Sequence, residues 1–410
     1  MPPTTSAAHR AERRPAGEDP ACFKQKLQNI LPEIKAKAGD TEKAAQVPAE
    51  NIAALRAAGL FDLVKPRAFG GHEYDFEVLV DATIDLAKAC ASTAWVGGLL
   101  AAHQWLLAGF PAEAQRDVWD RDPNALLCGS YAPVAKAAAV SGGYRLSGRW
   151  SFASGCDNSS WALCAALLPP AKDGETLAPA FLLVPANDYV IADTWHVIGL
   201  AGTGSKTLVL DDVFVPKHRV LTFAETTSGR TPGAKIYADN PSFSVPMLCY
   251  IPSCLAAVAV GTAMGALDDY VQATRARVTR GAVAGANSRM AEFATVQLRV
   301  AEAAASTDAA REVLLRDLRI VTRWAREGRE FSVGDRVTSR RGQAFAVSLA
   351  IRAVEALNAS TGGTGLDLSN PVQRAWRDAN AVGRHISMNW DAVGTMYGQY
   401  LLGLEPKGQF

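Results

Sequence analysis

The spacing of hydrophobic positions changes twice along the chain and divides it into three parts. From residue 22 to about residue 110, apolar residues recur at i, i+3 and i+4, which predicts amphipathic helices. From about residue 126 to residue 221, short β-rich runs alternate with turn residues, which predicts strands. Helical spacing returns from residue 252 onward. The order of secondary structure is therefore all-α, all-β, all-α.

These patterns also suggest individual elements and domain boundaries. A helix is expected over residues 50–61, and a single longer helix over residues 76–110. Further helices are expected from residue 252, over residues 291–318 and 340–360, and as one closing helix from about residue 371. We expect a disordered tail (1–21), an N-terminal helical domain (22–125), a central β domain (126–235) and a C-terminal helical bundle (236–410).

One segment imitates a membrane span. Residues 240–267 carry no charge, but prolines interrupt the segment at positions 241, 246 and 252. The uninterrupted remainder is too short to cross about 30 Å of hydrocarbon, so a helix buried within a bundle is the better interpretation. The N-terminus is charged and has no apolar signal core, which predicts a cytoplasmic protein without a membrane anchor.

Composition narrows the possible partners. The 410 residues include 42 Lys and Arg against 41 Asp and Glu, so the net charge of +1 provides no field for nucleic acid or an anionic membrane. Seven cysteines without CxxC spacing are expected to be reduced and mostly buried. No two of the six histidines are three to five residues apart, so no helix-borne metal pair is expected.

A glycine-rich stretch, GLAGTGSKT at residues 199–207, is similar to a phosphate-binding loop. Its Lys206 is one residue too far from Gly204, and a strand pattern follows instead of a helix. No βαβ unit surrounds it, so the chain has no recognisable nicotinamide-binding domain.

Five motifs resemble, in order, the landmarks of the acyl-CoA dehydrogenase fold from about residue 25 to 405. They are AALRAAGLFDLVKPRAFGG, FASG at residues 152–155, GTGSKTLVLDDVFVP, AEFATVQLRVAE and STGGTGLDLSNPVQRAWRDA at residues 360–379. The resemblance implies an α+β fold with an N-terminal helical domain, a central β-barrel or β-sandwich and a C-terminal four-helix bundle.

Two chemistries are known on that fold. Acyl-CoA dehydrogenases use a Glu base on the later helices, whereas AVGRHISMNWDAVGTMYGQYLLG here has none and offers only Asp391. This segment, TAWVGGLLAAHQW, CGSYAPV and FASGCDNSSW resemble oxygenase components of two-component phenol hydroxylases, including the 4-hydroxyphenylacetate and seco-steroid enzymes. The resemblance implies reduced FMN or FAD from a separate NAD(P)H-dependent flavin reductase, O2, a flavin C4a-hydroperoxide and ortho-hydroxylation of a phenol.

The resemblance also implies catalytic roles. His385 is expected to deprotonate the phenol, because a histidine suits proton abstraction near neutral pH. His103 and Ser130 are expected to hold the phenol oxygen. Ser154 is expected to place a hydroxyl at flavin N5 and thereby to slow loss of hydrogen peroxide. From local sequence alone, both histidines could equally be hydrogen-bonded core residues, and Ser154 a turn residue.

The flavin is expected to lie between two subunits of a homotetramer. Arg275 is a candidate phosphate ligand, although a solvated helix arginine is nearly as plausible. Glycines in the segment that a neighbouring subunit lays against the flavin permit close approach of the backbone. The expected cofactor-binding residues are Trp95, Phe152, Ser154, Thr203, Ser205, Arg275, Gly362, Gly363 and Thr364. The two aromatic residues could also belong to the core, and Thr203 and Ser205 to a plain hairpin.

The expected substrate wall, residues 241–253, contains no Arg or Lys. A buried carboxylate would lack a partner there, so an uncharged phenol is favoured. Three alternatives stay open. They are oxygen transfer to sulfur or nitrogen, a true acyl-CoA dehydrogenase with Asp391 as the base, and a helical scaffold with a vestigial flavin site.

Overall fold

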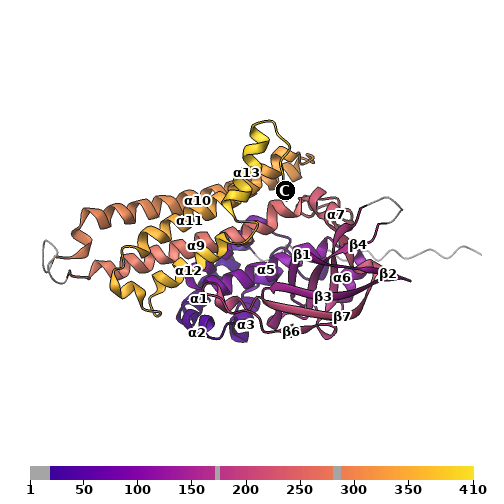
Figure 1. Ribbon diagram of the computed structural model, residues 1–410, viewed down its shortest axis with the longest axis horizontal. Helices are drawn as coiled ribbons and strands as arrows, with labels where there is room; N and C mark the ends of the chain where they lie inside the picture. Colours follow the sequence, from indigo (N-terminus) through magenta and orange to yellow (C-terminus); the bar gives the residue numbers. More distant parts are fainter. Residues whose placement is uncertain (1–18, 171–175, 280–287) are drawn as a thin grey trace, which may run out of the picture.

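The computed structural model describes residues 19–170, 176–279 and 288–410. The buried apolar residues of the first helices and of the later bundle form one core, and Figure 1 shows most of these first helices next to the bundle. In the described part of the chain, six α-helices precede the strands. They are α1 (Pro20–Ala36), α2 (Ala38–Lys43), α3 (Ala49–Ala58), α4 (Phe76–Ala89), α5 (Ala91–Ala108) and α6 (Ala112–Trp119).

Helices α4 and α5 correct the expectation of one helix over residues 76–110. Cys90 separates them in an extended conformation, with φ −156° and ψ 112°. Helix α5 is buried along almost its whole length. It approaches α4 closely at Gly98, where a Cβ would lie 3.0 Å from the Thr83 side chain. The glycine pair in α5 therefore serves helix packing, and the helix runs through the centre of the molecule.

The central strands form two four-stranded sheets, ordered β1-β4-β5-β8 and β2-β3-β7-β6. β1 and β4 are parallel, and the other pairs are antiparallel. Alternate residues pack between the sheets around the fully buried Trp150. The strands are β1 (Leu127–Lys136), β2 (Ala138–Val140), β3 (Gly143–Ala153), β4 (Trp161–Leu168), β5 (Ala178–Pro185), β6 (Val190–Ala192), β7 (Lys206–Pro216) and β8 (Val220–Thr222).

After two short helices, α7 (Phe223–Ser228) and α8 (Pro232–Ile236), the chain forms a bundle of long helices that extends away from the sheets (Figure 1). The bundle consists of α9 (Met247–Arg275), α10 (Ala294–Arg326), α11 (Val333–Asn358) and α12 (Pro371–Gly383), and α13 (Trp390–Leu401) packs on α11. The expected single closing helix is wrong, because the chain leaves helical geometry around His385, between α12 and α13.

Helix α9 starts at Met247 and continues through Pro252, so the expectation that it begins at that proline is also wrong. Proline has no N–H to donate to the Leu248 carbonyl one turn earlier. The side-chain amide of Gln343 on α11 donates to Leu248 O at 3.1 Å and Cys249 O at 3.2 Å instead. The bundle thus satisfies the Leu248 carbonyl that the proline leaves free.

Among the described residues, α9 is the one helix long and apolar enough to cross a membrane, and 89% of its most apolar window is buried inside the protein. The interpretation as a buried bundle helix is therefore confirmed. The expectation that the cysteines are mostly buried also agrees with the structure, because six of the seven are buried and Cys22 is exposed.

The α+β class and its three-part order are confirmed. The expected boundary after residue 125 falls between α6 and β1, and the one after residue 235 falls within α8. Residues 1–18 of the expected tail lie outside the described residues, and α1 begins at Pro20.

Candidate active site

A chain of buried hydroxyl groups lies where β3 ends and β7 begins. Ser154 follows the last residue of β3, and Thr203 and Ser205 lie in the turn before β7. The Ser154 and Ser205 hydroxyls are 2.7 Å apart, and so are those of Ser205 and Thr203. Thr203 also donates to the carbonyl of Leu200 at 2.8 Å. Three predicted flavin-binding residues thus form one network, which a plain hairpin would not require.

Helix α5 brings Trp95 to this network. The indole Nε1 of Trp95 donates to Ser154 Oγ at 2.9 Å, and both residues are buried. A Cβ at Gly155 would lie 2.8 Å from Val96, so a glycine is needed where the chain passes α5 with φ 72°. The Ser154 hydroxyl is therefore held between the indole N–H of Trp95 and the hydroxyl of Ser205.

His385 lies on the other side of Trp95, with the two rings edge to face and their centroids 5.8 Å apart. The Ser387 N–H donates to His385 Nδ1 at 3.1 Å, so the proton of the neutral ring is on Nε2. Burial and then the charge of Arg340 lower the pKa of His385 to about 4. The free ring nitrogen is therefore a hydrogen-bond donor near neutral pH.

His103 presents the opposite pattern. Its Nδ1 donates to the carbonyl of Leu127 at 2.6 Å, which leaves an acceptor lone pair on Nε2. This Nε2 is buried and has no hydrogen-bond partner among the described residues. Burial lowers the pKa of His103 to about 4, so the ring is neutral. The imidazole thus offers a buried, unused acceptor two turns along α5 from Trp95.

Strand β1 forms the wall opposite His103. A Cβ at Gly129 would lie 3.2 Å from His103 Cε1 and 3.0 Å from the Tyr131 ring, so this face of β1 points toward the histidine. Side chains alternate along a strand, which directs Ser130 away from His103. The Ser130 hydroxyl donates to the Ser151 carbonyl at 2.8 Å. The structure therefore brings Gly129 and Tyr131 to His103, and it engages Ser130 elsewhere.

Tyr131 was not singled out in the sequence. Its ring centroid is 5.8 Å from that of His103, and its hydroxyl is buried without a partner among the described residues. Burial raises the pKa of Tyr131 above its usual value, so the hydroxyl is neutral. A tyrosine two residues after a glycine in a strand gives a weak signal, which identifies a site only once β1 is seen against α5.

Phe152 lies beside the hydroxyl network but faces outward. Its side chain is 70% exposed, and its φ of 65° lies in the left-handed region that residues with a Cβ disfavour. Its ring contacts Trp195 edge to face, with centroids 6.0 Å apart. The exposed Phe152 ring, next to the buried hydroxyls, thus provides a flat apolar surface on which a planar ligand can stack.

The glycine-rich segment lies at the far end of the bundle. Arg277, which the sequence analysis did not name, donates to Thr361 O at 2.6 Å, and its guanidinium lies 2.9 Å from where a Gly362 Cβ would be. The predicted ligand Arg275 is exposed at the end of α9. Thr364 donates to Thr361 O at 3.3 Å, and Gly363 opens the following turn. No described contact joins this segment to Ser154 within one chain.

The structure also places Asp391 and the expected substrate wall, residues 241–253. Asp391, the alternative base, is exposed in the first turn of α13. The substrate wall forms the start of α9 and the turn before it, and most of its side chains are buried. Arg340 lies behind this wall, but its guanidinium already donates to Gln343, Ser387 and Gln409.

Comparison with known proteins agrees with this geometry. Residues 25–120 match the family described as acyl-CoA dehydrogenase, N-terminal domain, and residues 253–390 match its C-terminal domain. The chain is 68% identical over 381 residues to the FADH(2)-dependent resorcinol hydroxylase, oxygenase component, of Rhizobium sp. (strain MTP-10005), covering 92% of this chain and 93% of that protein.

The chain belongs to the flavin-dependent monooxygenases with the acyl-CoA dehydrogenase fold. The crystal structure of 3-HSA hydroxylase from Rhodococcus sp. RHA1 is 35% identical, with a TM-score of 0.88 over 95% of this chain and 98% of that one. XiaF from Streptomyces sp., in complex with FADH2 and glycerol, is 28% identical, with a TM-score of 0.85 over 95% of this chain and 98% of that one.

The residues present in this monooxygenase fit a flavin. Ser154 keeps one lone pair after its bonds to Trp95 and Ser205, and Phe152 offers an exposed ring beside it. Among the described residues, no group of three or more His, Cys, Asp or Glu could hold a metal ion. Its relatives indicate a chemistry that depends on reduced flavin and O2.

Proposed function

We propose that this monooxygenase adds a hydroxyl group ortho to the hydroxyl of a small, uncharged phenol, with resorcinol as the leading candidate. A separate NAD(P)H-dependent reductase supplies the reduced FAD. We further propose that the enzyme is a cytoplasmic homotetramer. Reduced flavin, with O2, supplies the oxygen atom that enters the ring, and the residues described above bind, orient and deprotonate the phenol.

The unused acceptor on His103 is the observation that carries this proposal. A buried polar atom without a partner costs about 1–3 kcal/mol, which a phenolic hydroxyl donating to Nε2 would recover. The same hydrogen bond prepares transfer of the phenol proton to His103, and the resulting phenolate is electron-rich at the ortho carbon. His385, with its proton on Nε2, is suited to donate to the resulting phenolate oxygen. This assignment favours His103 over His385 as the base.

The Tyr131 hydroxyl is the observation that favours a substrate with a second hydroxyl group. This buried hydroxyl and His103 Nε2 are two unpartnered polar atoms on neighbouring rings. A dihydric phenol can satisfy both, whereas a phenol with one hydroxyl leaves one of them unsatisfied. The name of the 68% identical relative, a resorcinol hydroxylase, agrees with this substrate class.

The wall around α9 supports an uncharged substrate. It carries no cationic side chain, and each nitrogen of the nearby Arg340 guanidinium already donates one hydrogen bond, to Gln343, Ser387 or Gln409. A substrate carboxylate would therefore be buried without a partner, at a cost of several kcal/mol.

The test is a comparison of coupled turnover with reduced FAD, O2 and matched phenols. Product formed per flavin oxidised should be highest for resorcinol, lower for phenol and lowest for 3-hydroxybenzoate, in which a carboxylate replaces the second hydroxyl. A higher kcat/KM for 3-hydroxybenzoate than for resorcinol would contradict the proposed substrate class.

A further inference from the structure

The hydroxyl network beside β3 has a direction that follows from counting protons. Each hydroxyl group has one proton to donate and two lone pairs to accept with. The Leu200 carbonyl can only accept, so Thr203 uses its proton there. Ser205 must then donate to Thr203, and Ser154 must donate to Ser205.

The direction leaves Ser154 as an acceptor on its remaining side. The single proton of Ser154 points inward to Ser205, and one of its lone pairs accepts the Trp95 N–H. The other lone pair is all that Ser154 can offer a ligand. All three hydroxyl side chains are at most 6% exposed, so water does not compete for these bonds.

The inner end of the network is anchored on α12. The Leu200 N–H donates to Asp378 Oδ1 at 2.6 Å, and Arg377 donates to Ile198 O, also at 2.6 Å. Leu200 has φ 54°, a left-handed conformation that its side chain disfavours, so outside contacts are needed to hold it. These contacts from α12 hold the Leu200 carbonyl in place. That carbonyl is the final acceptor of the chain of hydrogen bonds that runs from Ser154 through Ser205 and Thr203.

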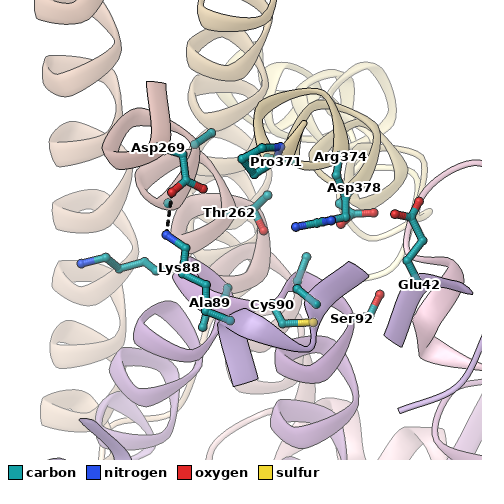
Figure 2. A pocket seen from close by; sticks show the side chains of 17 residues that line it. Glu42, Lys88, Ala89, Cys90, Ser92, Thr262, Asp269, Pro371, Arg374 and Asp378 are labelled. Carbon is teal, nitrogen blue, oxygen red and sulfur yellow. Dashed lines mark hydrogen bonds and ion pairs between the residues drawn. The ribbon is translucent and has the colours of Figure 1, made fainter. Parts of the chain in front are cut away.

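Asp378 borders a cavity of about 40 Å³ at the break between α4 and α5. Figure 2 shows Asp378 and Arg374 on α12 facing Glu42 and Ser92. The Asp378 carboxylate thus lies between this cavity and the Leu200 N–H, which donates to its Oδ1. The bond to Asp378 holds the backbone of Leu200 in place, and with it the direction of the Leu200 carbonyl that accepts from Thr203.

We propose that Ser205, Thr203 and Asp378 are positioning residues that hold Ser154 as a hydrogen-bond acceptor and so make the site selective for reduced over oxidised flavin. The inference rests on the proposed position of Ser154 at flavin N5. Reduced flavin carries a proton on N5 and can donate to Ser154. Oxidised flavin presents a lone pair at N5, which faces the lone pair of Ser154 and is repelled.

The test measures binding rather than turnover. Dissociation constants of oxidised FAD in air and of dithionite-reduced FAD without oxygen are compared by titration of the full-length protein. The wild type should bind reduced FAD more tightly. Ser205→Ala removes the acceptor for the Ser154 proton, which then becomes free to donate to oxidised N5. The ratio of the two constants, oxidised over reduced, should fall about 5- to 30-fold, the range expected for one hydrogen bond.

Matched variants distinguish an effect of the hydrogen-bond direction in the network from an effect of altered side-chain packing. Thr203→Val is isosteric, removes the next hydroxyl and should lower the ratio in the same sense, which covers a failure of Ser205→Ala to fold. Ser205→Thr restores a hydroxyl and should return the ratio toward that of the wild type. Ser151→Ala removes an exposed hydroxyl of β3 that bonds to Thr207 outside this network, and should leave the ratio unchanged.

The outcomes separate this inference from the proposed flavin site. If Ser154→Ala weakens reduced FAD but Ser205→Ala and Thr203→Val keep the wild-type ratio, Ser154 contacts the flavin and the inferred direction is wrong. If Ser154→Ala changes neither constant, the proposed position of the flavin is wrong and the inference falls with it.

Discussion

The two histidines of the candidate site differ in which nitrogen carries the proton. His103 donates from Nδ1 to a carbonyl and keeps Nε2 as an acceptor, whereas His385 accepts at Nδ1 and keeps its proton on Nε2. Their neighbours thus leave one ring with a free acceptor and the other with a free donor, which suits the complementary roles that we propose for them toward one phenolic oxygen. Neither residue type nor position in the sequence reveals this difference.

The first prediction compares these two histidines. His103→Ala should lower coupled hydroxylation by roughly 10²–10⁴-fold, because it removes the proton acceptor. His385→Asn keeps a side-chain donor and should cost less. The measurement is product and hydrogen peroxide formed per reduced flavin consumed, with peroxide replacing product in His103→Ala. A larger loss in His385→Asn would return the role of the base to His385.

The hydroxyl network shows what could be predicted at this scale. Family resemblance named Trp95, Ser154, Thr203 and Ser205, and the structure brings all four together although they come from three segments. It did not name Asp378, because a carboxylate within a helix carries no signal in the sequence. Its importance arises from a hydrogen bond to a residue 178 positions away.

At the scale of the elements, the predictions from the sequence were wrong mainly about where helices are interrupted and where they begin. Cys90 interrupts a helical pattern that has no glycine or proline beside it, and the break at His385 follows Gly383, a single glycine that did not by itself indicate the end of a helix. Pro252 suggested the start of a helix but lies inside one, where Gln343 from another helix satisfies the Leu248 carbonyl that the proline leaves free. Each error comes from tertiary contacts that override local preference.

The second prediction concerns the hydrogen bonds that Gln343 donates to α9 next to Pro252. Gln343→Ala should lower the free energy of unfolding by about 2–4 kcal/mol, because two buried carbonyls and the Arg340 guanidinium lose a partner. Gln297→Ala, at an exposed position of α10, should change it by less than about 0.5 kcal/mol. Urea unfolding monitored by circular dichroism measures both. Equal stability of the two variants would mean that α9 tolerates Pro252 without help.

At the scale of the whole molecule, the surface carries large apolar side chains far from the core. Leu366, Leu368, Ile386 and Leu402 are each more than 70% exposed. The first two adjoin the glycine-rich segment, which does not reach Ser154 within its own chain. Both observations support a flavin site shared between copies of this chain. One sequence could suggest this arrangement only through resemblance, because its hydrophobic pattern does not distinguish the core from an interface.

The third prediction is a pH dependence of stability. The pKa of Asp378 is raised from 3.8 to about 6, because burial, with a smaller contribution from Glu42, outweighs the lowering by the Leu200 N–H, Arg377 and Arg374. The folded state therefore favours the protonated acid, and this stabilisation is lost as the pH rises through about 6. The loss amounts to at most about 3 kcal/mol.

Asp378→Asn removes this titration. The stability of the variant relative to the wild type should therefore rise between pH 4 and pH 7, as followed by the midpoint of thermal unfolding. Asp391→Asn, at an exposed carboxylate on α13, is the control and should show no such trend. A relative stability of Asp378→Asn that is constant with pH would contradict the assigned shift.

The central claim is that the site around His103 and Ser154 transfers oxygen from O2 to a phenol. The most direct measurement mixes the enzyme, loaded with reduced FAD and resorcinol, with ¹⁸O₂ and analyses the product by mass spectrometry. We predict one ¹⁸O atom in each product molecule, in a new hydroxyl group ortho to an existing one. Unlabelled resorcinol recovered with stoichiometric hydrogen peroxide would contradict the account.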